Sequence, residues 1–265
     1  MSNLAFDTLN ALDLFDDGNN DDTDDNENDK IILHIPHSST NIPLRVGYIA
    51  NSKTIHDELA LITDWSTDTI FSNKYVSKIQ CDFSRIYCDV ERLQVNEPMD
   101  IFGRGIYYTK LIDGKPLRNI INYVRKDVQR LYDKHYEYFN SVIASKLSSL
   151  NTALIIDCHS FNDIPLSFED NTKERPDICI GINEFHTPIE LQTKVKDYFN
   201  SLGYSVEIDY PYSNTIVPYA YLNKNKAVQS IMVEVNKRLY MGNGNVIDAN
   251  VQTLNSVMNN LYKIL

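Results

Sequence analysis

The feature that most constrains the fold is a series of short apolar runs that alternate with longer amphipathic stretches. Runs of about four to eight residues rich in Ile and Val predict buried strands, and apolar residues three or four positions apart predict helices. The expected strands are residues 31–35, 75–80, 84–90, 153–157, 177–182, 204–209 and 229–235, and the expected helices are residues 54–72, 117–149, 188–202 and 246–264. This alternation favours an α/β fold with a mixed, largely parallel sheet flanked by helices on both faces.

The acidity of the chain is concentrated at its N-terminus. Residues 1–29 hold ten of the 36 Asp and Glu side chains and no Lys or Arg, so the remainder is almost neutral. Residues 17–29 are polar throughout, which predicts a disordered extension ahead of a single domain at 30–265. Neither part has the basic stripe that nucleic-acid binding requires, so we expect no nucleic-acid partner.

Cysteine use and hydropathy indicate a cytoplasmic protein. The four cysteines form no CxxC pair, and three of them lie in apolar, strand-like runs where Cys behaves as a small buried side chain. The N-terminus lacks the charged-then-apolar pattern of a signal peptide. No run approaches the roughly 18 apolar residues of a membrane span, so we expect no membrane partner.

Polar side chains follow the expected strands at the points where those strands end. His37 comes after residues 31–35, His159 follows residues 153–157, and Glu234 ends an otherwise apolar run. Ligands of parallel sheets bind beyond the carboxyl ends of the strands. Two histidines and a carboxylate are the usual ligands of a hydrolytic zinc ion, and a further carboxylate serves as the general base.

Each of these residues also has a structural interpretation. A histidine at a strand end is often only hydrogen-bonded, and Glu234 could form an ion pair with Arg238 or Lys237. Asp157 could cap a turn, or it could orient an imidazole, because it points to the same side of a strand as His159 two residues later. The chain has no HExxH motif, which excludes a zincin as far as a sequence can.

Five motifs in order along residues 31–242 resemble those of the N-formylglutamate amidohydrolase family. They are IPHSSTNIP at 35–43, TDWSTD at 63–68, SRIYCDVER at 84–92, DCHS at 157–160 and VEVNKRLYM at 233–241. The family is similar in fold to the zinc carboxypeptidases, a three-layer arrangement with a mixed sheet between helices. The resemblance therefore implies the same fold for residues 30–265 and a hydrolase that acts on linear amide bonds.

The resemblance also implies a set of metal ligands. It makes His37 and His159 zinc ligands and Glu234 the general base. Carboxypeptidases take a Glu three residues after the first histidine as the third ligand, but that position is Thr40 here. Asp64 is our choice instead, with Asp68, one helical turn later, as the alternative. Another divalent metal could replace zinc, because sites of nitrogen and oxygen ligands discriminate poorly by affinity.

The substrate that the resemblance implies is an acylated amino acid, most simply N-formyl-L-glutamate, giving formate and glutamate. Its carboxylates favour guanidinium partners. The candidate substrate-binding residues are Arg85, Arg92, Arg104, Ser160, Arg238 and Tyr240. Arg85 and Arg92 have an alternative role, as structural partners of Asp82 and Asp89.

The chain departs from the family pattern at two places. The family's Asn-Arg-Pro reads Glu91-Arg92-Leu93, and an aromatic segment at 210–215 replaces a glycine-rich loop. A related amidase acting on a peptide or cell-wall substrate, or a catalytically silent binding protein, are therefore alternatives. A Ser160–His159 nucleophile pair is disfavoured, because adjacent strand residues point apart. The sequence leaves the oligomeric state open.

Overall fold

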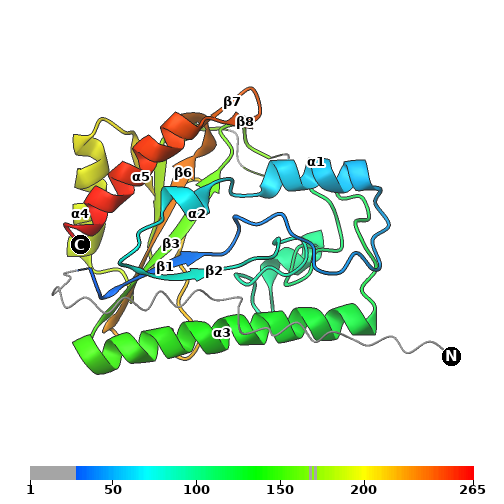
Figure 1. The fold of residues 1–265 in the computed structure, drawn as a ribbon, viewed down its shortest axis with the longest axis horizontal. Helices are drawn as coiled ribbons and strands as arrows, with labels where there is room; N and C mark the ends of the chain where they lie inside the picture. The colour runs from blue at the N-terminus through cyan, green and yellow to red at the C-terminus, as the bar shows by residue number, and fades with distance from the viewer. Residues whose placement is uncertain (1–27, 167–168, 170–171) are drawn as a thin grey trace.

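The computed structural model describes residues 28–166, 169 and 172–265, so the predicted acidic extension lies almost entirely outside the described residues. A six-stranded sheet runs through the described part in the order β2-β1-β3-β6-β4-β5 (Figure 1). The strands are β1 (Ile31–Ile35), β2 (Ser77–Gln80), β3 (Ala153–Phe161), β4 (Ile178–Gly181), β5 (Val206–Ile208) and β6 (Val228–Asn236). The first four in this order are parallel, whereas β4 is antiparallel to β6 and parallel to β5. The predicted mixed, largely parallel sheet is confirmed.

Helices cover both faces of the sheet, as predicted, with α3 on one side and α2, α4 and α5 on the other (Figure 1). Their bounds are α1 (Ser52–Ile62), α2 (Thr67–Ile70), α3 (Asn122–Leu150), α4 (Ile189–Ser201) and α5 (Asp248–Tyr262). Alternate residues of each strand point to opposite faces. Ile32 and Ile155 therefore pack with Phe139 of α3, whereas Leu33 and Ile156 share a core with α5.

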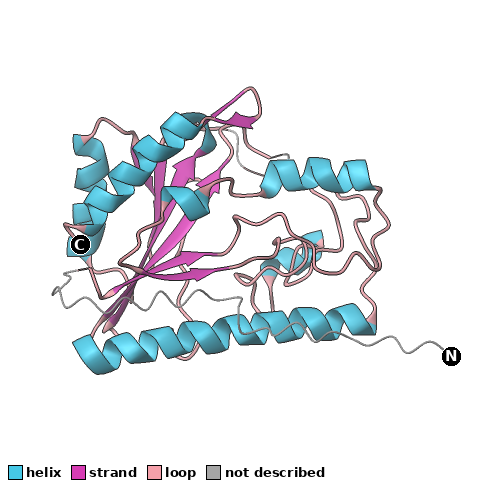
Figure 2. Cartoon of the chain, viewed as in Figure 1, coloured by secondary structure: helices cyan, strands magenta, loops and turns pink. Residues whose placement is uncertain are grey.

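The connection after β2 folds into a loop-rich region between α1 and α3 (Figure 2). It contains the short 3₁₀ helix η1 (Pro98–Phe102) and has its own apolar cluster, around Tyr87 and Tyr108. The predicted strand at 84–90 is wrong, because this segment is a turn in which Tyr87 and Cys88 donate to the carbonyl of Ser84. Its apolar side chains are buried against this second cluster rather than within the sheet, and burial alone does not distinguish the two cases.

The predicted helix at 54–72 is interrupted. α1 ends at Ile62, Thr63 is extended, and Ser66 adopts a left-handed conformation (φ 60°) before α2 begins. Instead of continuing the helix, the amide of Asp64 donates to the carbonyl of His37 at 3.0 Å. The interruption thus fixes Asp64 beside the segment that follows β1.

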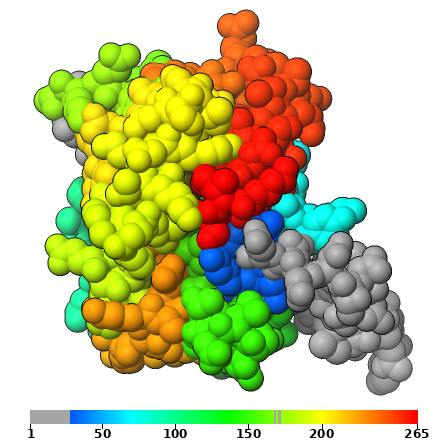
Figure 3. Space-filling model, turned by 90° about the vertical axis from the view of Figure 1, so that its left-hand side faces the viewer, coloured from blue at the N-terminus to red at the C-terminus, as the bar shows by residue number. Residues whose placement is uncertain are grey.

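The chain after β6 covers the face of the sheet opposite α3 (Figure 1). It forms the 3₁₀ helix η2 (Lys237–Leu239), the hairpin of β7 (Met241–Gly242) and β8 (Asn245–Val246), and then α5. Figure 3 shows α4 and α5 next to each other on the surface, and the Tyr198 hydroxyl donates to the carbonyl of Val257 at 2.7 Å.

All four cysteines are buried and free. In the described ranges, no helix is both long and apolar enough to cross a membrane.

Candidate metal centre and active site

Strand register places four polar side chains in a row across the sheet face that α3 covers. His34 of β1 is the register partner of Asp157 of β3, and His159 of β3 is the partner of Glu234 of β6. Partners in parallel strands point to the same side, and residues two apart do so as well. The predicted placement of Asp157 on the same side as His159 is confirmed by a 3.1 Å contact between its Oδ1 and His159 Nε2.

His37 is buried, and its two ring nitrogens have different surroundings. Its Nε2 lies 2.9 Å from Oδ1 of Asp89. Its Nδ1 has no hydrogen-bond partner among residues 28–166, 169 and 172–265, and lies 3.6 Å from Oε2 of Glu91 and 3.7 Å from Oδ2 of Asp64. A buried imidazole nitrogen that faces two carboxylates in this way is suited to bind a cation.

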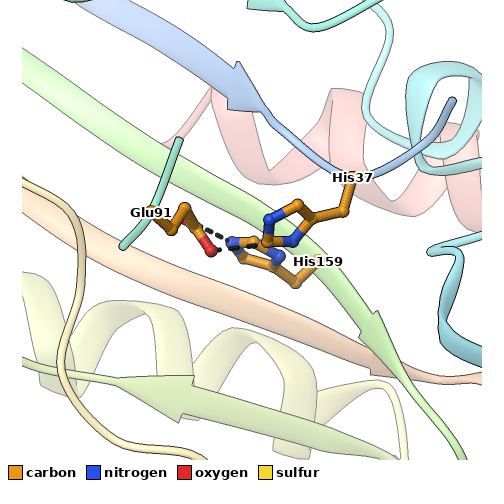
Figure 4. Close-up of side chains that lie close together, drawn as sticks. All are labelled: His37, Glu91 and His159. Atoms are coloured by element: carbon orange, nitrogen blue, oxygen red, sulfur yellow. Dashed lines mark hydrogen bonds and ion pairs between the residues drawn. The ribbon is translucent and has the colours of Figure 1, made fainter. Parts of the chain in front are cut away.

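His159 faces the same two carboxylates. Its Nδ1 is 3.0 Å from Oδ2 of Asp64, and its Nε2 is 3.0 Å from Oε1 of Glu91. Figure 4 shows His37, Glu91 and His159 turned toward one another. Burial alone would lower the pKa of His159, but the charges of Glu91 and Asp157 raise it well above its usual value. The surroundings therefore favour a positive charge at this point.

The residues fit a metal ion. Donor atoms of His37, Glu91 and His159 all lie within 4.8 Å of one another. Ligands of a tetrahedral zinc ion, each bound at roughly 2.0–2.1 Å, lie about 3.3 Å apart, close to the donor spacings seen here. Asp64 contacts both histidines, so it remains our predicted third ligand, and Glu91 joins it as a candidate. Asp68 makes no hydrogen bond or ion pair to either histidine within the described part of the chain.

Glu234 lies at the edge of this group and is 7% exposed. Burial raises its pKa to about 8; the charge of His159 lowers it, and those of Asp64 and Glu91 raise it further. A carboxyl group with a pKa near neutral can both accept and return a proton. The structure therefore gives Glu234 the environment of a general base.

Arg85 and Arg92 surround Asp89. Each guanidinium lies 3.2 Å from Oδ2 of Asp89, and Tyr108 donates to the same oxygen at 2.7 Å. The alternative structural role, pairing with Asp89, is thus confirmed for both arginines. Because Asp89 also contacts His37, it links the two arginines to the histidines. Burial lowers the pKa of Arg85, but Tyr108 and Asp89, followed by Asp64 and Glu91, raise it well above its usual value.

Comparison with known proteins identifies the family. The sequence model of the N-formylglutamate amidohydrolases matches residues 29–241. The chain belongs to the N-formylglutamate amidohydrolase family. No curated protein sequence matches the chain.

Two solved structures share the fold of this chain. The N-formylglutamate amidohydrolase from Ralstonia eutropha JMP134 matches with a TM-score of 0.76 and 15% identity, over 89% of this chain and 92% of that one. A gene product from Agrobacterium tumefaciens matches with a TM-score of 0.62 and 16% identity, also over 89% of this chain and 92% of that one.

Two of the arginines predicted to bind substrate have other partners. Arg104 is buried, 3.8 Å from Glu58, with its guanidinium over the ring of Tyr108. Arg238 pairs with Asp163 at 2.8 Å and Asp177 at 2.9 Å, so it does not form the ion pair with Glu234 that the sequence allowed. The structure brings neither arginine into contact with the histidines.

Ser160 and Tyr240 lie together on the other face of β3. Ser160 follows His159 and so points the opposite way, toward the core that contains Tyr240. Both hydroxyls are buried; burial raises the pKa of Tyr240, and its contact with Ser160 opposes this shift.

Several residues of the site were not predicted. Asp89 and Glu91 belong to the motif at 84–92, from which only Arg85 and Arg92 were predicted as site residues. Lys237 is 7% exposed and donates to Oδ1 of Asn162 at 2.9 Å. Burial lowers its pKa to about 8, and the charges of Asp64 and Glu234 oppose this shift. A histidine inside the buried strand at 31–35, His34, was the one sequence signal that could have indicated further polar groups here.

Proposed function

We propose that this chain is a zinc-dependent amidohydrolase that converts N-formyl-L-glutamate into formate and glutamate. The observation that carries the proposal is the buried Nδ1 of His37, which lies 3.7 Å from a carboxylate oxygen of Asp64 and 3.6 Å from one of Glu91. With His159 on the same two carboxylates, these four residues would hold the ion. Membership of the family supports the reaction and the substrate.

The protein's own residues account for the proton transfers. A bound zinc ion would polarise the scissile carbonyl and lower the pKa of its water. Glu234, at the register position beside His159, takes the proton of the attacking water. It then gives that proton to the departing amine, because its raised pKa lets it hold a proton near neutral pH.

Cationic side chains beside Glu234 would hold the carboxylates of the substrate. Arg85 is partly exposed, and the charges of Asp64, Glu91 and Asp89 act on it. Lys237 follows Glu234 by three residues in the sequence, and its side chain is almost fully buried. A guanidinium and a buried ammonium together suit a small dicarboxylate.

The test is Glu234→Gln, with Glu184→Gln, an exposed glutamate, as the matched control. Gln keeps the shape of the side chain but cannot accept the proton, so we expect kcat to fall by about 10²–10⁴-fold. Zinc content should stay at the wild-type level. Turnover within tenfold of the wild type would rule out Glu234 as the base.

A substrate panel tests the acyl group. N-formyl, N-acetyl and N-succinyl derivatives of glutamate, aspartate and glutamine, with short peptides, should be compared by kcat/KM. We expect N-formylglutamate to lead. A peptide or cell-wall fragment in first place would favour the related amidase, and no hydrolysis with no stoichiometric metal would favour the silent binding protein.

A further inference from the structure

A second group of metal-ligating side chains lies directly behind His159. The Nδ1 of His34 is 2.8 Å from Oδ1 of Asp157 and 3.8 Å from Oε1 of Glu91. Donor atoms of these three residues all lie within 4.8 Å of one another. His34 is fully buried and Asp157 is 2% exposed, so bulk water does not compensate their charges.

Four carboxyl groups lie close together around these histidines. Asp64, Asp157 and Glu234 are buried, and the side chain of Glu91 is 18% exposed. An ion held by His37, His159 and Asp64 leaves Glu91 and Asp157 around His34. Buried carboxylates are costly unless they are paired or coordinate a metal.

We propose that a second divalent cation binds at His34, Glu91 and Asp157, with Glu91 bridging it to the first ion. The two oxygens of Glu91 already face different partners, Oε2 toward His37 and Oε1 toward His34 and His159. Hydrolases with two metals hold them about 3.5–4 Å apart, a separation that one bridging carboxylate spans. The inference rests on the proposed function, because Glu91 is shared with the proposed zinc site.

Residues behind His34 complete the site. Its Nε2 lies 3.1 Å from Nε2 of His135, on α3, whose Nδ1 faces Sγ of Cys81 at 3.6 Å. If the ring proton of His34 is on Nε2, that nitrogen donates to His135. Nδ1 is then unprotonated and can bind the cation. Metal-bound histidines are usually oriented through their second nitrogen in this way.

The experiment counts metal ions. Chelator-treated, untagged protein is incubated with excess Zn²⁺ or Mn²⁺, passed over a desalting column and analysed for metal per chain. We expect two equivalents for the wild type and one for His34→Asn, which keeps a donor to Asp157 but removes the ring nitrogen. His56→Asn, an exposed histidine on α1, is the matched control and should keep two.

Electron paramagnetic resonance of the Mn²⁺-loaded wild type decides the question without a variant. Two ions that share Glu91 should give an exchange-coupled signal. One equivalent of metal with an isolated Mn²⁺ signal would overturn the second site, whether or not His34→Asn folds. In that case N-formylglutamate hydrolysis would still stand, whereas no bound metal and no turnover would overturn the proposed function itself.

Discussion

Each of the two histidines at the site has a carboxylate at its Nε2 that can fix the orientation of the ring. Asp89 holds Nε2 of His37 at 2.9 Å, and Asp157 holds Nε2 of His159 at 3.1 Å. Both Nδ1 atoms are then directed toward Asp64. A carboxylate behind a metal-binding histidine fixes its tautomer and ring orientation, so the direction of these rings is determined before an ion arrives.

Removing one of these carboxylates should weaken metal binding. In Asp89→Asn, His37 loses its charged partner, and Arg85 and Arg92 lose the oxygen they share. We expect zinc affinity to fall by about 10–100-fold, measured by competition with a chromophoric chelator. Asp113→Asn, an exposed carboxylate that pairs with Lys115, is the control. An affinity within twofold of the wild type would argue against this role of Asp89.

Metal binding should release protons. The raised pKa of His159 keeps it protonated near neutral pH, and a ligand imidazole must be neutral. Glu234, with a pKa of about 8 in the metal-free protein, is mostly protonated at pH 7, and a nearby dication favours its carboxylate. Zinc affinity should therefore fall as the pH is lowered from 8 to 6.

Calorimetry in buffers of different ionisation enthalpy measures this release. Glu234→Gln should release about one proton fewer than the wild type at pH 7, because its side chain does not titrate. Equal release by the two proteins would show that Glu234 is already ionised before the metal binds.

At the scale of elements, the break between α1 and α2 is what positions Asp64. The carbonyls at the end of α1 have partners outside the helix: Trp65 Nε1 donates to Ala60 at 3.0 Å, and Asn162 donates to Leu61 at 3.1 Å. Helix ends need such partners, because the last carbonyls have none within the helix. The sequence pattern continued through the break, so these distant contacts could not be predicted from it.

Trp65→Phe removes the indole donor and should loosen the end of α1. We expect a loss of about 1 kcal/mol in the free energy of unfolding, the usual size of one hydrogen bond. Urea titration followed by circular dichroism measures it, with Tyr75→Phe, at an exposed position, as the control. Unchanged stability would mean that water replaces the indole at the carbonyl of Ala60.

At the scale of the whole molecule, the site combines residues that are far apart in the sequence. The sheet could be predicted, because its strands are apolar runs whose ends carry His37, His159 and Glu234. The loop-rich region could not, because no periodicity places Asp89 against His37, 52 residues earlier. The same holds for Glu91 and for the contact of His34 with His135, on a helix 101 residues away. Sequence therefore indicated the histidines, Asp64, Asp157 and Glu234, but not Glu91 or the contact of Asp89 with His37.

Because the candidate ligands come from four separate segments, a bound ion should stabilise the whole molecule. At a free zinc concentration 100 times Kd, binding contributes about 2.7 kcal/mol, which for a domain of this size raises Tm by about 5–10 °C. Differential scanning calorimetry with zinc and with a chelator measures the shift. His37→Asn should lose most of it, and His56→Asn should keep it; a wild-type shift under 1 °C would contradict a site that joins these segments.

Trp65 has a consequence for how this protein can be followed in solution. It is the single tryptophan of the chain, adjacent to Asp64 and partly buried. All tryptophan emission therefore comes from one indole at the rim of the candidate site. Binding of an ion at Asp64, or of a substrate beside it, can therefore be followed in real time by intrinsic tryptophan fluorescence. The measurement needs no label and works for every variant except Trp65→Phe.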